Sequence, residues 1–130
     1  MGSLMSTVKA NDLQTTTGGI PTVKGQNLIP TAWVNFNGSG AVSIRDSENV
    51  SSITDAGTGQ YKVNFASNML NTNYSVSGSA GHPNSRDCVL MAPMTVKSIS
   101  QVGCRAGGSN NVDAVYDATE MSILIMGGQA

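Results

Sequence analysis

The chain has 130 residues, a length typical of one domain with a small hydrophobic core. Only 12% of the residues are charged, the formal net charge is −1, and the seven Lys and Arg residues are scattered. This composition lacks the basic patch of a nucleic-acid-binding protein, and no run approaches the roughly 20 apolar residues of a membrane helix. We therefore expect no nucleic-acid partner and no membrane insertion.

Residues 1–30 differ in pattern from the rest of the chain. Apolar residues are sparse over residues 6–30, where two prolines and the Gly18-Gly19 pair interrupt them. We expect an extended N-terminal arm, with local β pairing over residues 8–13; a flexible linker is the alternative. The apolar side chains expected to anchor the arm on a partner are those of Val8, Leu13, Ile20 and Val23.

From Thr31 to Ser77, apolar and polar residues alternate with a period of two, which is typical of strands with one buried face. Asn37-Gly38 is a strong hairpin signal because both residues suit a tight turn. The alternation slips between Val50 and Ile53, and a β-bulge would absorb that slip. The predicted elements are strands over residues 32–37, 41–45, 50–54, 60–65 and 73–78, with a single helical turn over 66–70.

The second half of the chain continues the β pattern. Residues 87–92 are apolar on both faces, so we expect a strand that is central or lies at an interface. A long strand is predicted over residues 95–105, another over 111–117, and the last over 121–126. About nine strands between regular turn signals are typical of a sandwich or barrel. We predict an all-β, antiparallel, jelly-roll-like β-sandwich domain over residues 31–130.

The last strand is apolar on both faces, which is difficult to place on the outside of a monomer. An exposed apolar strand invites aggregation, and burial against other subunits would remove that hazard. We therefore predict a homo-oligomer. The candidate residues for the subunit interface are Ile123, Leu124, Ile125 and Met126.

The two cysteines, Cys88 and Cys104, both fall in predicted strands. They are too few for a disulfide framework and lack the spacing of a metal site. They are interpreted as two small buried thiols. A bridge between neighbouring strands stays open as the alternative, since it depends on the Cα separation.

One stretch of the sequence resembles a known protein family. AWVNFNGSGAVSIRDSENVSSITDAGTGQYKVNF (residues 32–65), followed by NYSV (residues 73–76), is similar to a tail-fibre or fibre-tip domain of tailed bacteriophage virion proteins. The leader STVKANDLQ (residues 6–14) resembles the start of small phage proteins that carry this domain. The resemblance implies a β-rich, commonly trimeric module on a virion assembled in the bacterial cytoplasm. It carries over no catalytic residue.

Two roles within that family fit the chain: a knob or decoration protein on the capsid, and a fibre tip that binds a host-surface glycan. An arm of about 30 residues reaches at most about 100 Å when fully extended. That is enough to clasp neighbouring subunits but short for a fibre shaft. We therefore expect a homotrimeric knob bound to other virion proteins, with the glycan-binding fibre tip as the alternative.

No catalytic group stands out. His82 is the only histidine, no G-x-S-x-G nucleophile motif accompanies it, and a solvated loop residue explains it better than a Ser/His/Asp triad. Three symmetry copies of His82 around an axis would be the metal-binding alternative. A polysaccharide-cleaving enzyme would need a carboxylate pair that is not evident. We expect no enzymatic activity, no cofactor and no resident metal.

Other patterns have structural explanations. Residues 103–109 are Gly-rich, but they lack the Lys of a phosphate-binding loop, so a turn explains them. Asp46, Glu48 and Asp55 are acidic residues of predicted turns, where Asp commonly bonds the backbone; calcium binding is the alternative. Trp33 alternates away from the expected core, so it either packs beneath the arm or a second layer, or offers a platform for a sugar or a partner chain.

If the protein binds a receptor, its loops are the expected site, because a rigid sandwich presents loops freely. Asn, Ser and Arg side chains there would hydrogen-bond sugar hydroxyls. The candidates lie in the loops over residues 81–87 and 105–111. They are His82, Asn84, Arg86, Arg105, Asn110 and Asn111.

Overall fold

The computed structural model describes residues 6–18, 29–82, 96–108 and 114–128, and the backbone of residues 88–91. Six residues singled out from the sequence lie outside these ranges: Ile20, Val23, Asn84, Arg86, Asn110 and Asn111. The described residues form eight strands and no helix. These are β1 (Ala32–Asn37), β2 (Ser43–Glu48), β3 (Val50–Gly57), β4 (Gln60–Phe65), β5 (Tyr74–Gly81), β6 (Cys88–Met91), β7 (Gln101–Gly108) and β8 (Glu120–Gly127).

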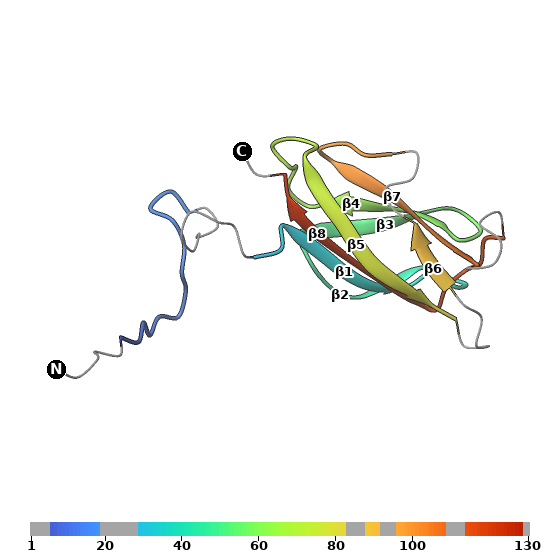
Figure 1. Ribbon diagram of the computed structural model, residues 1–130, viewed down its shortest axis with the longest axis horizontal. Coiled ribbons are helices and arrows are strands. Elements are labelled where there is room, and N and C mark those ends of the chain that lie inside the picture. The colour runs from blue at the N-terminus through green and yellow to red at the C-terminus, as the bar shows by residue number, and fades with distance from the viewer. Residues whose placement is uncertain (1–5, 19–28, 83–87, 92–95, 109–113, 129–130) are drawn as a thin grey trace.

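The strands form two antiparallel sheets that face each other as a β-sandwich (Figure 1). The strand orders are β2-β1-β8-β5 and β3-β4-β7-β6. The sandwich predicted from the period-two pattern is therefore confirmed. Its connectivity is not that of a jelly roll. Three pairs of strands that are consecutive in the chain (β1–β2, β3–β4 and β6–β7) are also neighbours in the same sheet, the first pair in one sheet and the other two in the second.

The core lies between the sheets and is built from alternate residues of the central strands. β1 contributes Ala32, Val34 and Phe36, while Trp33 and Asn35 point to the outer side. Aromatic edges meet inside: the rings of Phe36 and Tyr61, one from each sheet, lie 5.2 Å apart at 76°. Such edge-to-face pairs add about 0.5–1.5 kcal/mol to the burial of the rings.

The sandwich has two distinct ends. At the proximal end, where the N-terminal segment joins, the Thr31 amide donates to the Ile125 carbonyl (2.8 Å) and the Thr31 hydroxyl donates to the Gly127 carbonyl (2.6 Å). At the distal end, the Gly38 amide donates to the Ala118 carbonyl (2.8 Å) and joins two loops. Because β1 and β8 run antiparallel between these contacts, the ends are separated by the length of the strands.

Residues 6–18 are all exposed and form no helix or strand. In Figure 1 they lie apart from the sandwich. The local β pairing expected over residues 8–13 is therefore not found. Within this segment the Gly18 amide donates to the Thr15 carbonyl, and the hydroxyls of Thr15 and Thr17 bond each other.

The strand predicted over residues 95–105 is wrong, because a turn divides it. The Ser98 hydroxyl accepts the Gln101 amide (3.1 Å), and the Ser98 amide donates to the Gln101 carbonyl (3.0 Å). This side-chain turn reverses the chain, so that Lys97 pairs with Val102 and β7 begins at Gln101. The strand expected over residues 87–92 is β6, an edge strand and not a central one; the alternative that it lies at an interface stays a prediction.

The helical turn predicted over residues 66–70 is also wrong. The amides of Ala66, Met69 and Leu70 donate to the distant carbonyls of Asn49, Ile99 and Gly128. These bonds replace the local ones that a helical turn would need. Over the described part of the strand predicted at 111–117, only Val115 forms an isolated bridge, to Gly107.

The other predicted boundaries are nearly right. β1 and β4 begin and end where the alternation predicts, while β2, β3 and β5 begin or end up to three residues away. The bulge expected near the start of β3 is confirmed by a register shift between Val50 and Ser52.

Candidate partner-binding surfaces

The outer face of the β2-β1-β8-β5 sheet carries the tryptophan. Trp33 lies opposite Glu48 on one side and Leu124 on the other. Its side chain is half-buried, and Leu124 is 38% exposed. The described residues of the N-terminal segment do not cover this face, so packing of Trp33 beneath them is not observed.

A β-bulge in β2 places charged side chains beside this face. The register shifts where Asn35 pairs with Asp46 and Phe36 pairs with Ile44, which leaves Arg45 as the extra residue. Bulges re-aim side chains in this way, often next to functional sites. Arg45 thereby reaches across β1 to the start of β8.

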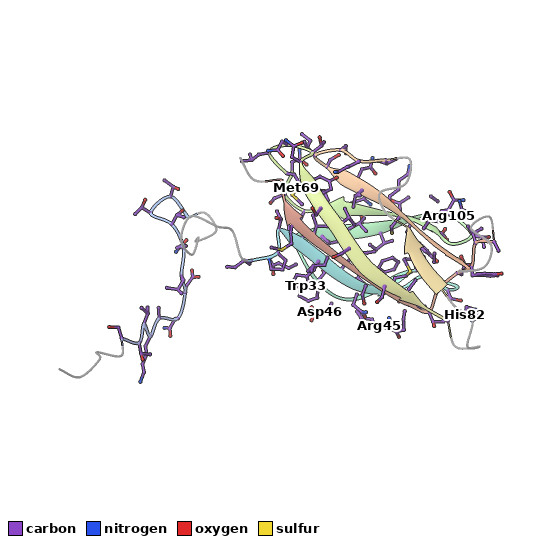
Figure 2. All side chains as sticks on the ribbon, viewed as in Figure 1. Trp33, Arg45, Asp46, Met69, His82 and Arg105 are labelled. Atoms are coloured by element: carbon purple, nitrogen blue, oxygen red, sulfur yellow. The ribbon has the colours of Figure 1, made fainter. Side chains whose placement is uncertain are left out.

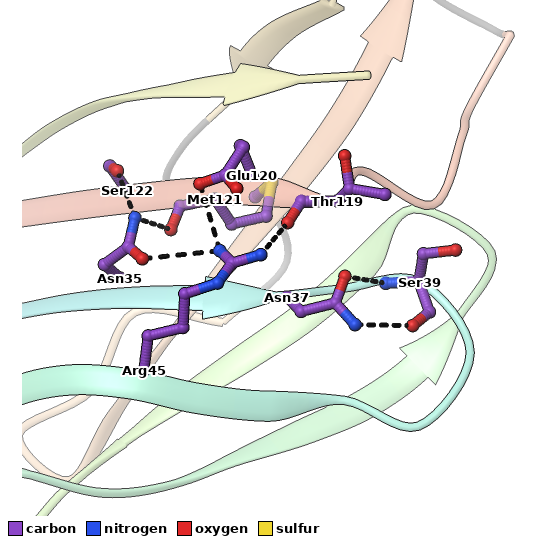
Figure 3. A network of polar contacts seen from close by, with 8 residues as sticks. All are labelled: Asn35, Asn37, Ser39, Arg45, Thr119, Glu120, Met121 and Ser122. Carbon is purple, nitrogen blue, oxygen red and sulfur yellow. Dashed lines mark hydrogen bonds and ion pairs between the residues drawn. The ribbon is translucent and has the colours of Figure 1, made fainter. Parts of the chain in front are cut away.

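Figure 3 shows the polar network that results. The Arg45 guanidinium donates to Asn35 Oδ1 (3.3 Å), to Glu120 Oε2 (3.0 Å) and to the Thr119 carbonyl (2.7 Å). Asn35 Nδ2 in turn donates to Ser122 Oγ (2.9 Å). The network ties three neighbouring strands together across the sheet. Since both ionic groups are well exposed, the Coulombic part of the Arg45–Glu120 pair contributes at most about 1 kcal/mol.

Sequence reasoning missed this network. Its signal was weak because Arg45 and Glu120 lie 75 positions apart. The only sequence feature that relates to the network is the alternation that places Asn35 on the same side of its strand as Trp33.

The candidate interface residues on β8 fall on two different faces. Ile123 and Ile125 are 2% and 0% exposed and belong to the core of their own chain. They are therefore unable to line a surface, and their assignment to a subunit interface is corrected. Leu124 and Met126 alternate with them on the outer face, where Leu124 is exposed and Met126 half-buried. β8 is a central strand with both edges paired, yet its outer row, Ser122, Leu124 and Met126, is not buried.

Of the six candidate receptor residues, the structure describes His82 and Arg105. Both side chains are half-buried. His82 directly follows β5, and Arg105 lies on β7 opposite Gln60 and Met91. Figure 2 places both in the half of the sandwich away from the N-terminal segment.

The distal end contains a polar cluster around Tyr61. The Tyr61 hydroxyl donates to the Gly38 carbonyl (2.8 Å) and lies 3.4 Å from Asp117 Oδ1, which also accepts the Gly59 amide (2.7 Å). Burial, followed by the nearby Asp117 carboxylate, raises the pKa of Tyr61 above its ordinary value. The bonds join three loops, so this cluster stabilises the fold at the distal end.

The two cysteines do not form a bridge with each other. Cys88 lies opposite Gly108, which is four residues beyond Cys104 on β7. At about 3.3 Å per residue this separates the two positions by roughly 13 Å, and a disulfide needs Cα atoms within about 7 Å. Cys104 is a buried free thiol, and burial raises its pKa to about 12.

Two of the three acidic residues considered for calcium, Asp46 and Asp55, accept backbone amides. Asp46 Oδ1 accepts the Ser47 amide (2.9 Å) and Asp55 Oδ1 accepts the Gly57 amide (3.0 Å). Among the described residues, no group of three or more His, Cys, Asp or Glu side chains is arranged to hold a metal ion. No helix in that part of the chain has the length and apolar character needed to span a membrane.

Comparisons with known proteins give no relative to set beside this geometry. No family model matches the chain, and neither a search of curated proteins nor a search of solved structures finds a match.

Proposed function

We propose that this chain is a structural protein of a bacteriophage virion. In this proposal it forms a homotrimeric β-sandwich knob on the particle surface, with residues 31–130 as the knob and residues 1–30 as the anchoring arm. It is assembled in the bacterial cytoplasm and acts by binding other virion proteins, not by catalysis. The resemblance of residues 32–65 to phage fibre domains supports this assignment.

The observation that carries the proposal is the two-ended arrangement of the chain. The N-terminal segment joins the sandwich at the proximal end and exposes apolar side chains, Val8 at 78% and Leu13 at 62%. The distal end carries the loops that would face outward. An N-terminal segment that lies outside the sandwich and exposes apolar side chains is suited to bind a partner surface.

Deletion of residues 1–30 tests the anchoring role. We expect the shortened chain to fold, because every buried core residue that the structure describes follows position 30, and to be lost from purified particles. Particle composition measured by mass spectrometry after expression in infected cells checks this. The matched control is Leu70→Ser, which changes an exposed apolar residue outside the arm. Normal incorporation of the shortened chain would refute the anchoring role.

The alternative is a fibre tip that binds a host-surface glycan. It is favoured by the position of His82 and Arg105, which lie in the half of the molecule opposite the N-terminal segment. Cell-adsorption assays with the isolated protein separate the two functions. The alternative expects saturable adsorption that falls when Arg86→Ala and Asn84→Ala are combined, whereas the knob expects no adsorption at all.

A further inference from the structure

Two surfaces of this chain both expose apolar side chains, and one side of the second carries a charge opposite to that of the first. We call the first the tryptophan face; it consists of Trp33, Asp46, Glu48 and Leu124 on the outer side of the β2-β1-β8-β5 sheet. The second is the segment of residues 6–18. Each leaves apolar side chains exposed.

The tryptophan face is an apolar centre with an acidic edge. Trp33 and Leu124 are directly opposite each other on neighbouring strands. Glu48 is opposite Trp33 on the next strand, and Asp46 is opposite Asn35. Both carboxylates are exposed. Among the described residues the ion pair joins Arg45 and Glu120, which leaves the charges of Asp46 and Glu48 available.

The N-terminal segment carries the complementary groups. Lys9 is exposed, and Leu13 is 62% exposed. In an extended segment, residues 9 and 13 point to the same side and are separated by about 13 Å. Val8 and Asp12 point to the other side, so the side that carries Lys9 and Leu13 is positively charged although residues 6–18 are neutral as a whole.

The spacing of these groups fits the face. Leu124, Trp33 and Glu48 lie in one row across three strands. Neighbouring strands are about 4.8 Å apart, so Leu124 and Glu48 are separated by roughly 10 Å, with Trp33 between them. An extended segment that runs along this row, perpendicular to the strands, brings Leu13 to Leu124 and Lys9 to Glu48.

We propose that residues 6–18 of one copy bind the tryptophan face of a second copy. Leu13 packs on Trp33 and Leu124, and the Lys9 ammonium lies beside the carboxylates of Glu48 and Asp46. The segment lies apart from its own sandwich in Figure 1, which leaves the face open to another chain. This inference rests on the self-association part of the proposed function. It assigns Lys9 and Leu13 to the contact between copies, so deletion of residues 1–30 removes this contact together with the anchoring role, whereas the charge exchange below tests the contact alone.

Charge exchange in the full-length chain tests the contact. Lys9→Glu and Glu48→Lys each place like charges together, and each is expected to weaken association about tenfold or more, measured by sedimentation. The two changes combined restore an attractive pair and are expected to recover most of the loss. Leu13→Ser weakens association, whereas the matched controls Val8→Ser and Leu70→Ser leave it unchanged.

Trp33 is the only tryptophan, so its fluorescence reports on the face directly. In the Lys9→Glu/Leu13→Ser chain, which lacks a competent segment, a synthetic peptide of residues 6–18 is expected to shift the Trp33 emission saturably to shorter wavelength. The Lys9→Glu peptide is expected to shift it at about tenfold higher concentration.

Four results would overturn the inference: a wild-type chain that stays monomeric, a charge-exchanged pair that recovers nothing, no response of Trp33 to the peptide, or a response to host saccharides alone. The particle assay is independent of all four. A chain that associates through this face yet is absent from particles would refute the virion role and leave the contact standing.

Discussion

Tyr61 connects the core with two loops at the distal end of the sandwich. Its ring packs against Phe36 in the core, and its hydroxyl reaches the Gly38 carbonyl and Asp117. A buried tyrosine needs such a partner, because an unsatisfied hydroxyl or carbonyl costs about 1–3 kcal/mol. One side chain thereby fixes the β1–β2 loop relative to the segment before β8.

We expect Tyr61→Phe to lower the free energy of unfolding by about 1–3 kcal/mol at neutral pH, because the Gly38 carbonyl loses its donor. The substitution also changes the alkaline profile. In the folded protein the pKa of Tyr61 is raised above 10.0. The stability linked to Tyr61 is therefore present below pH 10 and is lost above it, since the unfolded chain releases this proton first.

Guanidinium unfolding at neutral pH and up to about pH 11 measures both effects. The Phe variant should lose less stability above pH 10 than the wild type. Tyr74 and Cys104, whose pKa values are also raised by burial, keep part of the slope in both proteins. Equal slopes in the two proteins would contradict the burial of a neutral Tyr61.

At the scale of elements, β8 shows how one strand serves two surfaces. It pairs with β1 on one side and β5 on the other, so neither of its edges is open. Its inner residues Met121, Ile123 and Ile125 fill the core, and its outer residues alternate with them. The apolar outer residue Leu124 is not needed for the core of its own chain.

This division predicts that two neighbouring truncations affect different quantities, the stability of the chain and the association of its copies. Ile123→Ala is expected to lower the free energy of unfolding by about 2–5 kcal/mol, because it leaves a cavity in the core. Leu124→Ala is expected to change it by less than about 1 kcal/mol in the dissociated chain but to weaken association of the copies. Denaturant unfolding at low protein concentration and sedimentation at high concentration separate these effects. A large loss of stability from Leu124→Ala alone would contradict the assignment.

At the scale of the whole molecule, the chain divides into a packed sandwich and an N-terminal segment whose described residues, 6–18, contribute nothing to the core. Only 12% of all residues are charged, and the sandwich surface is rich in Ser, Thr and Asn. Such a surface is less costly to desolvate than an ionic one. This suits a protein whose faces pack against neighbouring chains.

The division predicts the order of proteolysis. In dilute protein, cleavage is expected first within residues 6–18, which are wholly exposed and form no strand, and the sandwich is expected to survive. At concentrations where the copies associate, the same segment should be protected. Mass spectrometry of the fragments checks both. Equal cleavage rates at the two concentrations would contradict docking of the segment.

The sequence by itself determined the fold class, because period-two alternation fixes which side chains enter a core. β1 and β4 follow that pattern residue by residue, and even the slip near Val50 was resolved as a bulge. The pattern was least informative where local polar bonds compete with it. At Ser98 the side chain forms a turn, although the apolar spacing suggested a continuous strand.

Only the tertiary structure decided which apolar rows are covered. Ile123 and Leu124 are indistinguishable in the sequence, yet the second sheet covers one, and the other lies beside Trp33. The same holds for Arg45 and Glu120, and for the two cysteines, whose separation follows from strand register. Strand order and register are set by contacts between residues far apart in the chain. A local periodic pattern does not predict those contacts.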